Sequence, residues 1–373
     1  MRLAIDIGGT FTDIVLENEH QLLTKKVLTS IAQPELAVIE GISDLLNENN
    51  INSSEIKMII HGTTLATNAI IERKGAKTCF ITTEGFRDVL DIGYESRFDQ
   101  YDILIEKTMS LVPRKHRYVI EERTDINGSQ IKPINTTQFK KLIEKIKNEN
   151  FESIGIGFLH SYANSDNENI LKQYILDNLS GVEVSVSSDV CPEIREYERF
   201  TTTVVNAYIK PLISNYLKKL EYELIEKGFN CPLLLMTSGG TLTNIPSACN
   251  NPVRLVESGP AGGAILATSI AKDLNLNKVI SFDMGGTTAK ITIIENKMAI
   301  KAREFEVDRK ARFKKGSGFP LRIPVIEMVE IGAGGGSIAR VNKLEQIIIG
   351  PNSAGSLPGL SLIHISEPTR LHT

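Results

Sequence analysis

The stretch AIDIGGTFTDIVLENE, residues 4–19, decides the fold because it places an aspartate and two glycines between two apolar runs. A P-loop would need a lysine and a following helix, and neither the lysine nor helical spacing follows Thr12. The pattern therefore predicts strand, turn and strand, with Gly8 and Gly9 at a hairpin tip. Tip glycines can adopt positive φ and bring bare amides to an oxyanion, while Thr10 and Thr12 can donate from their hydroxyls. An ordinary hairpin turn is the alternative.

A second copy of this tip lies far along the chain, in VISFDMGGTTAKITIIE at residues 279–295. The matching pairs are Asp6 and Asp283, Gly8 and Gly285, Gly9 and Gly286, and Thr10 and Thr287; Thr288 follows in the second copy and Asp13 aligns with Lys290. A tip that occurs twice predicts two related lobes whose hairpins face one another across a cleft, and it disfavours the ordinary turn.

Composition limits the class of protein. The 373 residues predict two domains, and a hydrophobic share of 41% is typical of globular proteins. With 42 basic and 45 acidic residues, and no basic stripe interleaved with aromatics, we expect no nucleic-acid partner. No apolar run is long enough to span a bilayer, so a membrane role is not expected. The four cysteines have no zinc or redox spacing, which predicts reduced thiols and a cytoplasmic location.

Helix and strand patterns alternate along the rest of the chain, which predicts an α/β fold. Helices are expected from Pro34, and from about Thr201 to Lys227, where a long helix containing Pro211 is the candidate connector between lobes. The second lobe is expected to begin around this helix. It is expected to contain the strands LLLMTSGG and VRLVESG, a helix in AGGAILATSIAKDL, the second hairpin, and a buried strand in VIEMVEIGAGGGSIARV.

A threonine-rich turn, HGTTLATNAI at residues 61–70, follows one strand and opens a helix. It concentrates polar groups at a helix N-terminus, which suits an anion or a carbonyl. We take His61, Thr63, Thr64 and Asn68 as candidates for the substrate end of the cleft. The alternative is that a threonine caps the helix and that His61 is simply a satisfied loop histidine.

Two glycine-rich segments and a charged one are also candidates. GAGGGS, with Gly334, Gly335 and Gly336, is too glycine-dense for ordinary packing, and it favours close approach of the backbone to a flat ligand. ESGPAGGAI has the form of the threonine-rich turn, with glycines that open a helix after a strand, and helix-on-sheet packing is an equal alternative. Arginines crowd the loop-rich stretch 91–132, where Arg97 is the candidate for a substrate carboxylate; a solvated charged face is the alternative.

The two Asp-x-Gly-Gly-Thr hairpins resemble the ATPase core shared by actin, sugar kinases and heat-shock chaperone ATPases. HGTTLATNAI, GFRDVLDIG, LVPRKHRYVIEER, SSDVCPEIREYERFTTTVVNAY, VESGPAGG, SFDMGGTTAK and EIGAGGGSIA, in this order, resemble the hydantoinase A/oxoprolinase family. The resemblance runs from Arg2 to about Gly359. It implies a two-lobed, actin-like (ribonuclease H-like) α/β fold with the nucleotide in the interlobe cleft.

The resemblance also implies a function. Members of the family open cyclic amides such as hydantoins or 5-oxoproline with ATP, and related members carboxylate ketones. They commonly work with a hydantoinase B-type partner, so a hetero-oligomer is expected. The family pattern SYxNPxHE reads SYANSDNE here, so no role of its histidine is carried over.

The end of the chain departs from the family. Members continue beyond the SAGxxPGP segment, whereas this chain runs from Gly359 into SLIHISEPTRLHT, which resembles translated sequencing adapter. The expected regions are an N-terminal lobe at 1–180, a connector with the long helix at 181–228, a partial hydantoinase A domain at 198–360, and a non-native tail at 361–373. The second lobe is therefore expected to be incomplete.

The expected mechanism places MgATP between the hairpins. The amides of the tip glycines and the hydroxyls of Thr10, Thr12, Thr287 and Thr288 would hold its phosphates, and Asp6 and Asp283 would hold Mg²⁺ largely through water. Phosphoryl transfer to a substrate oxygen would then activate a poor leaving group. Asp13 is a further possible metal or water ligand. Two alternatives are an ATP-dependent ketone carboxylase subunit and a non-catalytic, ATP-binding regulatory subunit.

Overall fold

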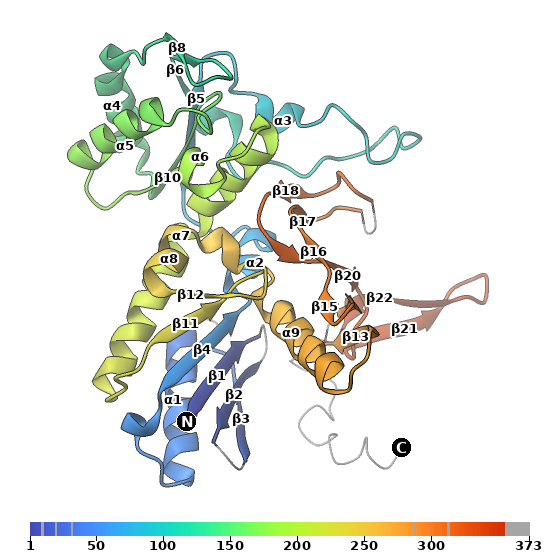
Figure 1. Ribbon diagram of the computed structural model, residues 1–373. Helices are drawn as coiled ribbons and strands as arrows, with labels where there is room; N and C mark the ends of the chain where they lie inside the picture. Colours follow the sequence, from blue (N-terminus) through green and yellow to red (C-terminus); the bar gives the residue numbers. More distant parts are fainter. Residues whose placement is uncertain (9–10, 19–20, 31–32, 287, 312–313, 355–373) are drawn as a thin grey trace. The chain divides into compact units, whose positions relative to one another are not determined.

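A computed structural model of the chain describes residues 1–8, 11–18, 21–30, 33–286, 288–311 and 314–354 (Figure 1). Contacts within the chain divide it into two compact units. The first comprises Met1–Ser258 and Arg303–Val325, and the second comprises Gly259–Ala302 and the chain from Ile326 onward. The sequence-based division followed the order of the motifs and not contacts within the chain. Its regions, 1–180, 181–228 and 198–360, stay a prediction.

The first unit is built on a six-stranded sheet in the order β12-β11-β4-β1-β2-β3. Strands β1, β2 and β3 are antiparallel neighbours. Strand β4 lies parallel to β1, and β11 lies parallel to β4. In β1, alternate residues are buried, as the alternation of apolar and polar residues requires. The strands are β1 Arg2–Ile7, β2 Phe11–Glu17, β3 Leu22–Leu28, β4 Met58–Thr63, β11 Leu233–Met236 and β12 Leu242–Asn244.

A second sheet of the same unit, β10-β9-β5-β6, is parallel throughout. Helices α4 and α5 pack against it through Phe139, Leu142, Leu171 and Ile175, all almost fully buried with the strand residues. Each such side chain contributes about 1.5–3 kcal/mol by leaving water. The elements are β5 Thr78–Thr83, β6 Arg117–Ile120, β9 Ser153–Gly157, β10 Glu183–Val186, α4 Phe139–Glu149 and α5 Asp166–Asn178.

The predicted long helix is confirmed as α7, Glu196–Glu226, with Pro211 inside it. It contacts β9 and β10 of the second sheet, and also the helices α1 and α2 that accompany the first sheet. Because all these elements lie in the first unit, α7 links the two sheets of that unit and is not the predicted connector between lobes. The strand LLLMTSGG, expected in the second lobe, is β11 of the first sheet. The helices predicted from Pro34 and after His61 are confirmed as α1, Pro34–Glu48, and α2, Leu65–Ile71.

The remaining elements of the first unit are short. The segment Arg303–Val325 carries a two-stranded hairpin, β17–β18, which contacts α2 and α7. These elements are α3 Val89–Ile92, β7 Arg123–Thr124, β8 Gln130–Lys132, α6 Ser187–Val190, α8 Ile245–Asn250, β17 Phe305–Val307 and β18 Phe319–Leu321.

The second unit repeats the start of the first sheet. Strand β14 pairs antiparallel with both β13 and β20, as β2 does with β1 and β3, and within the described residues no parallel strand joins β13. Its elements are α9 Ser258–Asp273, β13 Lys278–Met284, β14 Ala289–Glu295, β15 Met298–Ala299, β16 Lys301–Ala302, β19 Val325–Ile326, β20 Met328–Ile331, β21 Ser337–Val341 and β22 Ile347–Ser353.

The two copies differ in how one face of the leading strand is covered. Leu3, Ile5 and Ile7 of β1 are at most 3% exposed, whereas their matches in β13 are 72%, 56% and 54% exposed, namely Ile280, Phe282 and Met284. Such an open apolar face is unusual in a finished domain. The described part of the second unit therefore holds the beginning of a lobe, in agreement with the prediction of an incomplete second lobe.

Two local predictions were wrong. The segment VRLVESG is not a strand: a 3₁₀ turn occupies Pro252–Leu255, and α9 begins at Ser258. The strand expected to be buried before the glycines is split into β19, which is buried, and β20, which is largely exposed. In both places tertiary packing overrides an apolar pattern that fits several structures.

No helix in the part of the chain that the structure describes combines the length and apolar character needed to cross a bilayer.

Candidate functional site

The first hairpin tip forms as the sequence predicts. In the β1–β2 register Asp6 lies opposite Asp13 and Ile7 opposite Thr12, and the Gly8 amide donates to the Phe11 carbonyl across the turn at 2.9 Å. Because side chains alternate along a strand, Asp6 leaves the buried face and is exposed. Gly9 and Thr10 lie outside the described residues.

The second tip has the same geometry. Asp283 lies opposite Lys290 and Met284 opposite Ala289, and the Gly285 amide donates to the Thr288 carbonyl at 2.9 Å. Asp283 is exposed, as Asp6 is. Thr287 lies outside the described residues. The repeat predicted from the sequence is therefore a repeat of register and turn bonding in the described residues, including the break in symmetry at Lys290.

The turn at the tip requires glycine for a different reason from the one predicted. The described tip glycines, Gly8, Gly285 and Gly286, do not adopt positive φ. At Gly8 a Cβ would lie 3.0 Å from the Phe11 carbonyl oxygen, so the turn admits no side chain without shifting. Close approach across the turn, rather than left-handed backbone, explains this residue.

The segment after the third strand supports each tip. The Thr29 hydroxyl donates to the Gly8 carbonyl at 3.1 Å, and the matching Gly285 carbonyl accepts from the Gly335 amide at 2.9 Å. The Gly336 amide donates to the Gly286 carbonyl at 2.8 Å. Thr29 was not among the predicted residues, and its position directly after a strand that pairs with the hairpin was the available signal.

These bonds also explain the glycine-rich loop at Gly334–Gly336. A Cβ on Gly336 would lie 2.9 Å from the Gly286 carbonyl oxygen, so the loop backbone approaches the hairpin tip itself. Two of its amides are already donated to the tip. Contact of this loop with a flat ligand stays a prediction.

Thr12 does not fit the role predicted for it. Its side chain is fully buried, and its hydroxyl lies 3.0 Å from the Thr29 hydroxyl. Thr12 is thus a link between the second and third strands rather than a phosphate donor at the surface. Thr288 is partly exposed at the second tip.

The carboxylates near the tips have different surroundings. Asp13 forms an ion pair with Lys26 at 3.2 Å, and both side chains are about half exposed. Asp283 lies beside the glycine-rich start of α9, where a Cβ on Gly263 would be 3.8 Å from its Oδ2 atom. Among the described residues, no three histidine, cysteine or acidic side chains gather as a metal cluster.

His61 does not lie where a substrate contact needs it. Its ring is fully buried, with Nε2 2.8 Å from the Tyr216 hydroxyl and Nδ1 3.4 Å from the Ile5 carbonyl. Burial lowers the pKa of His61 to about 4, so the ring is neutral at pH 7. The substrate role is therefore wrong for this ring, and the alternative of a satisfied histidine holds, on strand β4 rather than in a loop.

The threonine-rich turn is also bonded internally. The Thr64 hydroxyl donates to the Ile7 carbonyl at 3.1 Å and accepts from the Asn68 amide at 3.3 Å. Thr63 is buried, and its hydroxyl accepts from the Leu65 amide at 3.1 Å. The donors expected to face a substrate carbonyl thus hold the end of β1 against the start of α2. This corrects the roles given to Thr63 and Thr64, whereas Asn68 is partly exposed and stays a candidate.

Arg97 is exposed in the long loop after α3, where its guanidinium donates to the Asp102 carbonyl of the same loop. This bond lies within the loop itself, and a role of Arg97 in binding a substrate carboxylate stays a prediction.

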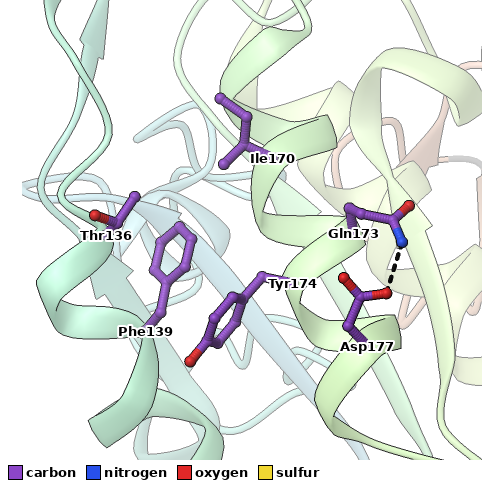
Figure 2. A pocket seen from close by; sticks show the side chains of 6 residues that line it. All are labelled: Thr136, Phe139, Ile170, Gln173, Tyr174 and Asp177. Carbon is purple, nitrogen blue, oxygen red and sulfur yellow. Dashed lines mark hydrogen bonds between the residues drawn. The ribbon is translucent and has the colours of Figure 1, made fainter.

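One pocket of about 400 Å³ lies between α4 and α5. Figure 2 shows Phe139, Tyr174 and Ile170 around it, with the Gln173 amide donating to Asp177 at 2.8 Å. It contains none of the predicted site residues. The repeated tips, and not this pocket, carry the candidate site.

The chain matches two family models, described as hydantoinase/oxoprolinase N-terminal region over residues 2–179 and hydantoinase/oxoprolinase over residues 199–364. It is 43% identical to an uncharacterized protein of Methanocaldococcus jannaschii, covering 96% of this chain and 53% of that protein. It is 31% identical to caprolactamase subunit alpha of Pseudomonas jessenii, covering 96% of this chain and 51% of the relative. The chain spans about half the length of these relatives.

Two solved structures share the fold. The ATP-dependent caprolactamase of Pseudomonas jessenii aligns with a TM-score of 0.82 at 28% identity, covering 98% of this chain and 52% of that one. A nucleotide-free acetone carboxylase aligns with a TM-score of 0.80 at 24% identity, covering 95% of this chain and 51% of that one. The chain thus has the α/β fold of actin-like ATPases, as the paired hairpins predict. By its motifs and its two family matches, the chain belongs to the hydantoinase/oxoprolinase family.

Proposed function

We propose that this chain is the ATP-binding part of an ATP-dependent hydrolase that opens a cyclic amide. The repeated hairpin carries the proposal. In both copies an exposed aspartate is the last residue but one of the leading strand, and a glycine amide closes the same turn. A single tip of this kind could be an ordinary turn. Two tips that share the same strand register, and whose first glycine carbonyl accepts a hydrogen bond in both, are suited to bind one polyphosphate together.

In this proposal the two tips bind the same nucleotide. The amides of Gly9 and Gly286 and the hydroxyls of Thr10, Thr287 and Thr288 contact its phosphates, with Gly8 and Gly285 fixing the turns. The carbonyls of Gly8 and Gly285 are tied by Thr29 and Gly335. Such tying orders the tips before a ligand arrives and reduces the entropy lost on binding.

Asp6 and Asp283 fit Mg²⁺ because both are exposed carboxylates, the hard oxygen ligands that this ion prefers. Mg²⁺ commonly uses one or two protein carboxylates together with water and phosphate oxygens, so a larger acidic cluster is not required. When bound, the ion would neutralise charge on the phosphates. Asp13, which pairs with Lys26 at 3.2 Å, is a further candidate for a metal or water ligand.

The reaction follows from this arrangement. ATP would supply a γ-phosphoryl group that bonds to the ring carbonyl oxygen as its bond to ADP breaks, which would make the carbonyl carbon more electrophilic. One water would add at that carbon and the C–N bond would break, leaving an acyl phosphate. A second water would hydrolyse the acyl phosphate to a carboxylate and phosphate. This chain contributes positioning and charge neutralisation. A hydantoinase B-type subunit completes the enzyme as a hetero-oligomer, and the four free cysteines accord with a cytoplasmic location.

A ketone carboxylase subunit is the second candidate. Acetophenone carboxylase gamma subunit of Aromatoleum aromaticum is 25% identical over 95% of this chain, and the acetone carboxylase structure has a similar fold. Such an enzyme would use the same nucleotide tips. A purely regulatory ATP-binding subunit would also use them, without turnover of a small substrate.

The metal and nucleotide roles are tested by Asp6→Asn and Asp283→Asn, in a version of the chain extended to the length of its relatives and supplied with the B-type partner. Matched controls are Glu17→Gln and Glu295→Gln, at the far ends of the same hairpins. We expect Mg²⁺-dependent ATP turnover to fall at least 100-fold in the aspartate variants, on the order of 3 kcal/mol, and to persist in the controls. Full turnover in a folded Asp283→Asn variant would refute the proposal.

The substrate class is tested by phosphate release with hydantoin, 5-oxoproline, caprolactam, and acetone plus bicarbonate. Ring opening is followed separately, so that uncoupled ATP hydrolysis is not counted. We expect stimulation by a cyclic amide. Stimulation by the ketone mixture alone would support the carboxylase, and ATP binding without stimulation by any substrate would support the regulatory subunit.

A further inference from the structure

The loop between α3 and the 3₁₀ turn at Arg114–His116 contains no helix or strand over residues 94–112, called here the 94–112 loop. Figure 1 shows it as a long excursion beyond α3. Loops longer than about 12–15 residues without secondary structure are uncommon in compact domains and are usually either functional or disordered.

The base of this loop is tightly held within its unit. The Thr108 hydroxyl donates to the Ser317 carbonyl at 2.7 Å, the Arg73 guanidinium donates to the Met109 carbonyl at 3.0 Å, and Val112 is fully buried in the core. At the other end, the Tyr94 ring packs edge-on against the Tyr197 ring at 5.0 Å. Disordered linkers do not make such contacts.

The outer part of the loop is also bonded. Asp99 forms an ion pair with Lys314, which lies between β17 and β18 of the hairpin, and accepts from the Tyr101 amide at 3.2 Å. Asp102 accepts from the Leu104 amide at 2.9 Å, and the Arg97 guanidinium donates to the Asp102 carbonyl. These bonds fix the backbone around a tip that is otherwise directed to solvent.

The tip presents large apolar side chains. Tyr101 is 95% exposed, Ile103 86% and Leu104 82%. An ordered loop that displays an aromatic and two aliphatic side chains has the composition of a binding hot spot, because the entropy cost of ordering it is already met in the free protein. Single exposed leucines are ordinary, but three such residues on one bonded tip are not.

Charge restricts what covers this tip. Asp99 is paired with Lys314, and the rest of the loop carries Glu95, Asp102 and Glu106 against Arg97 and Lys107. This excess of acidic residues opposes docking on an anionic lipid surface. It favours a protein surface with an apolar pocket and basic residues at its rim.

We propose that the 94–112 loop docks the second subunit of the enzyme through Tyr101, Ile103 and Leu104. This inference rests on the proposed function, which supplies a hydantoinase B-type subunit as the partner. Two relatives are themselves named as subunits, caprolactamase subunit alpha and acetophenone carboxylase gamma subunit. The tip inserts into an apolar pocket of the partner, and the carboxylates around it face basic side chains there.

The test uses a purified B-type subunit from the same organism and measures its dissociation constant with the chain by calorimetry. The double variant Ile103→Ser, Leu104→Ser removes the apolar tip without touching its backbone bonds. The matched control is Ile126→Ser, Ile131→Ser, which changes two isoleucines that are 67% and 69% exposed elsewhere in the first unit. We expect at least tenfold weaker binding for the tip variant and no change for the control.

Two further measurements separate this inference from the proposed function. The tip variant should bind MgATP with the same affinity as the unaltered chain. If only the proposed nucleotide role is wrong, the unaltered chain will bind the B-type subunit but will not bind MgATP. Glu106→Lys should weaken binding most at low salt, because charge attraction is screened as salt rises.

The inference is overturned if the tip variant binds the B-type subunit as tightly as the unaltered chain, or if the unaltered chain does not bind it. Sedimentation of the chain alone supplies a further outcome. Self-association that the tip variant abolishes would assign the loop to a second copy of this chain and would also overturn the inference.

Discussion

His61 gives the sharpest prediction about stability, and pH is the perturbation. The ring is buried between the Ile5 carbonyl and the Tyr216 hydroxyl, where a neutral imidazole can donate from Nδ1 and accept at Nε2. A second proton would place a positive charge on a fully buried ring. The folded state therefore resists protonation of His61 at a pH where the unfolded chain accepts a proton freely.

The magnitude follows from the pKa. Burial lowers the pKa of His61 from 6.5 to about 4. A depressed folded-state pKa contributes stability that is present above pH 6.5 and is lost as the pH falls toward 4. Each unit in this window is worth about 1.4 kcal/mol, so the free energy of unfolding should fall by about 2.5 kcal/mol between pH 7.5 and 4.5 from this residue alone.

The assay is urea unfolding followed by circular dichroism at pH 7.5 and pH 4.5, because the chain has no tryptophan to report by fluorescence. The variant His61→Gln keeps a polar side chain but cannot titrate in this range, and His116→Gln serves as the control. His61→Gln should be less stable at pH 7.5, and it should lose about 2.5 kcal/mol less than the unaltered chain on acidification.

Direct titration of the histidine Cε1 protons by NMR provides an independent check. A His61 resonance that titrates near pH 6.5 would refute the reasoning. So would an acid loss in His61→Gln equal to that of the unaltered chain, since the buried ring would then contribute nothing to the pH dependence.

Three further predictions concern packing and the tips. Gly157→Ala should lower the free energy of unfolding by about 1–3 kcal/mol, because its Cβ would lie 2.6 Å from the Phe200 ring; an unchanged urea midpoint would contradict this packing. Arg199→Lys should lower the free energy of unfolding by about 3 kcal/mol, because the buried guanidinium donates to three separate acceptors that one ammonium cannot all reach. A decrease below about 0.5 kcal/mol in the same urea measurement would contradict this. Gly336→Ala should reduce MgATP affinity about tenfold by pushing the loop from the Gly286 carbonyl; wild-type affinity in calorimetry would separate the loop from the nucleotide site.

The hairpins were predictable from the sequence because they depend on short-range rules. Alternation along each strand places Asp6 and Asp283 on the exposed face, and the spacing of the glycines sets the turns. The same local pattern predicted the mismatch of Asp13 and Lys290, which lie at equivalent paired positions. The order of the motifs along the chain was sufficient to identify the family.

The tertiary structure decided which polar residues are free to act. Thr12, His61 and Thr64 all belong to polar motifs, yet each is bonded to a group that lies far away in sequence: Thr29, Tyr216 and Ile7 respectively. A sequence pattern shows that a side chain can donate or accept, but not whether a distant strand or helix has already taken that bond. Gly336 makes the same point, since its need for a bare Cα arises from the Gly286 carbonyl fifty residues earlier in the chain. Burial and bonding of this kind appear only when the chain is folded, because they depend on residues that only tertiary packing brings together.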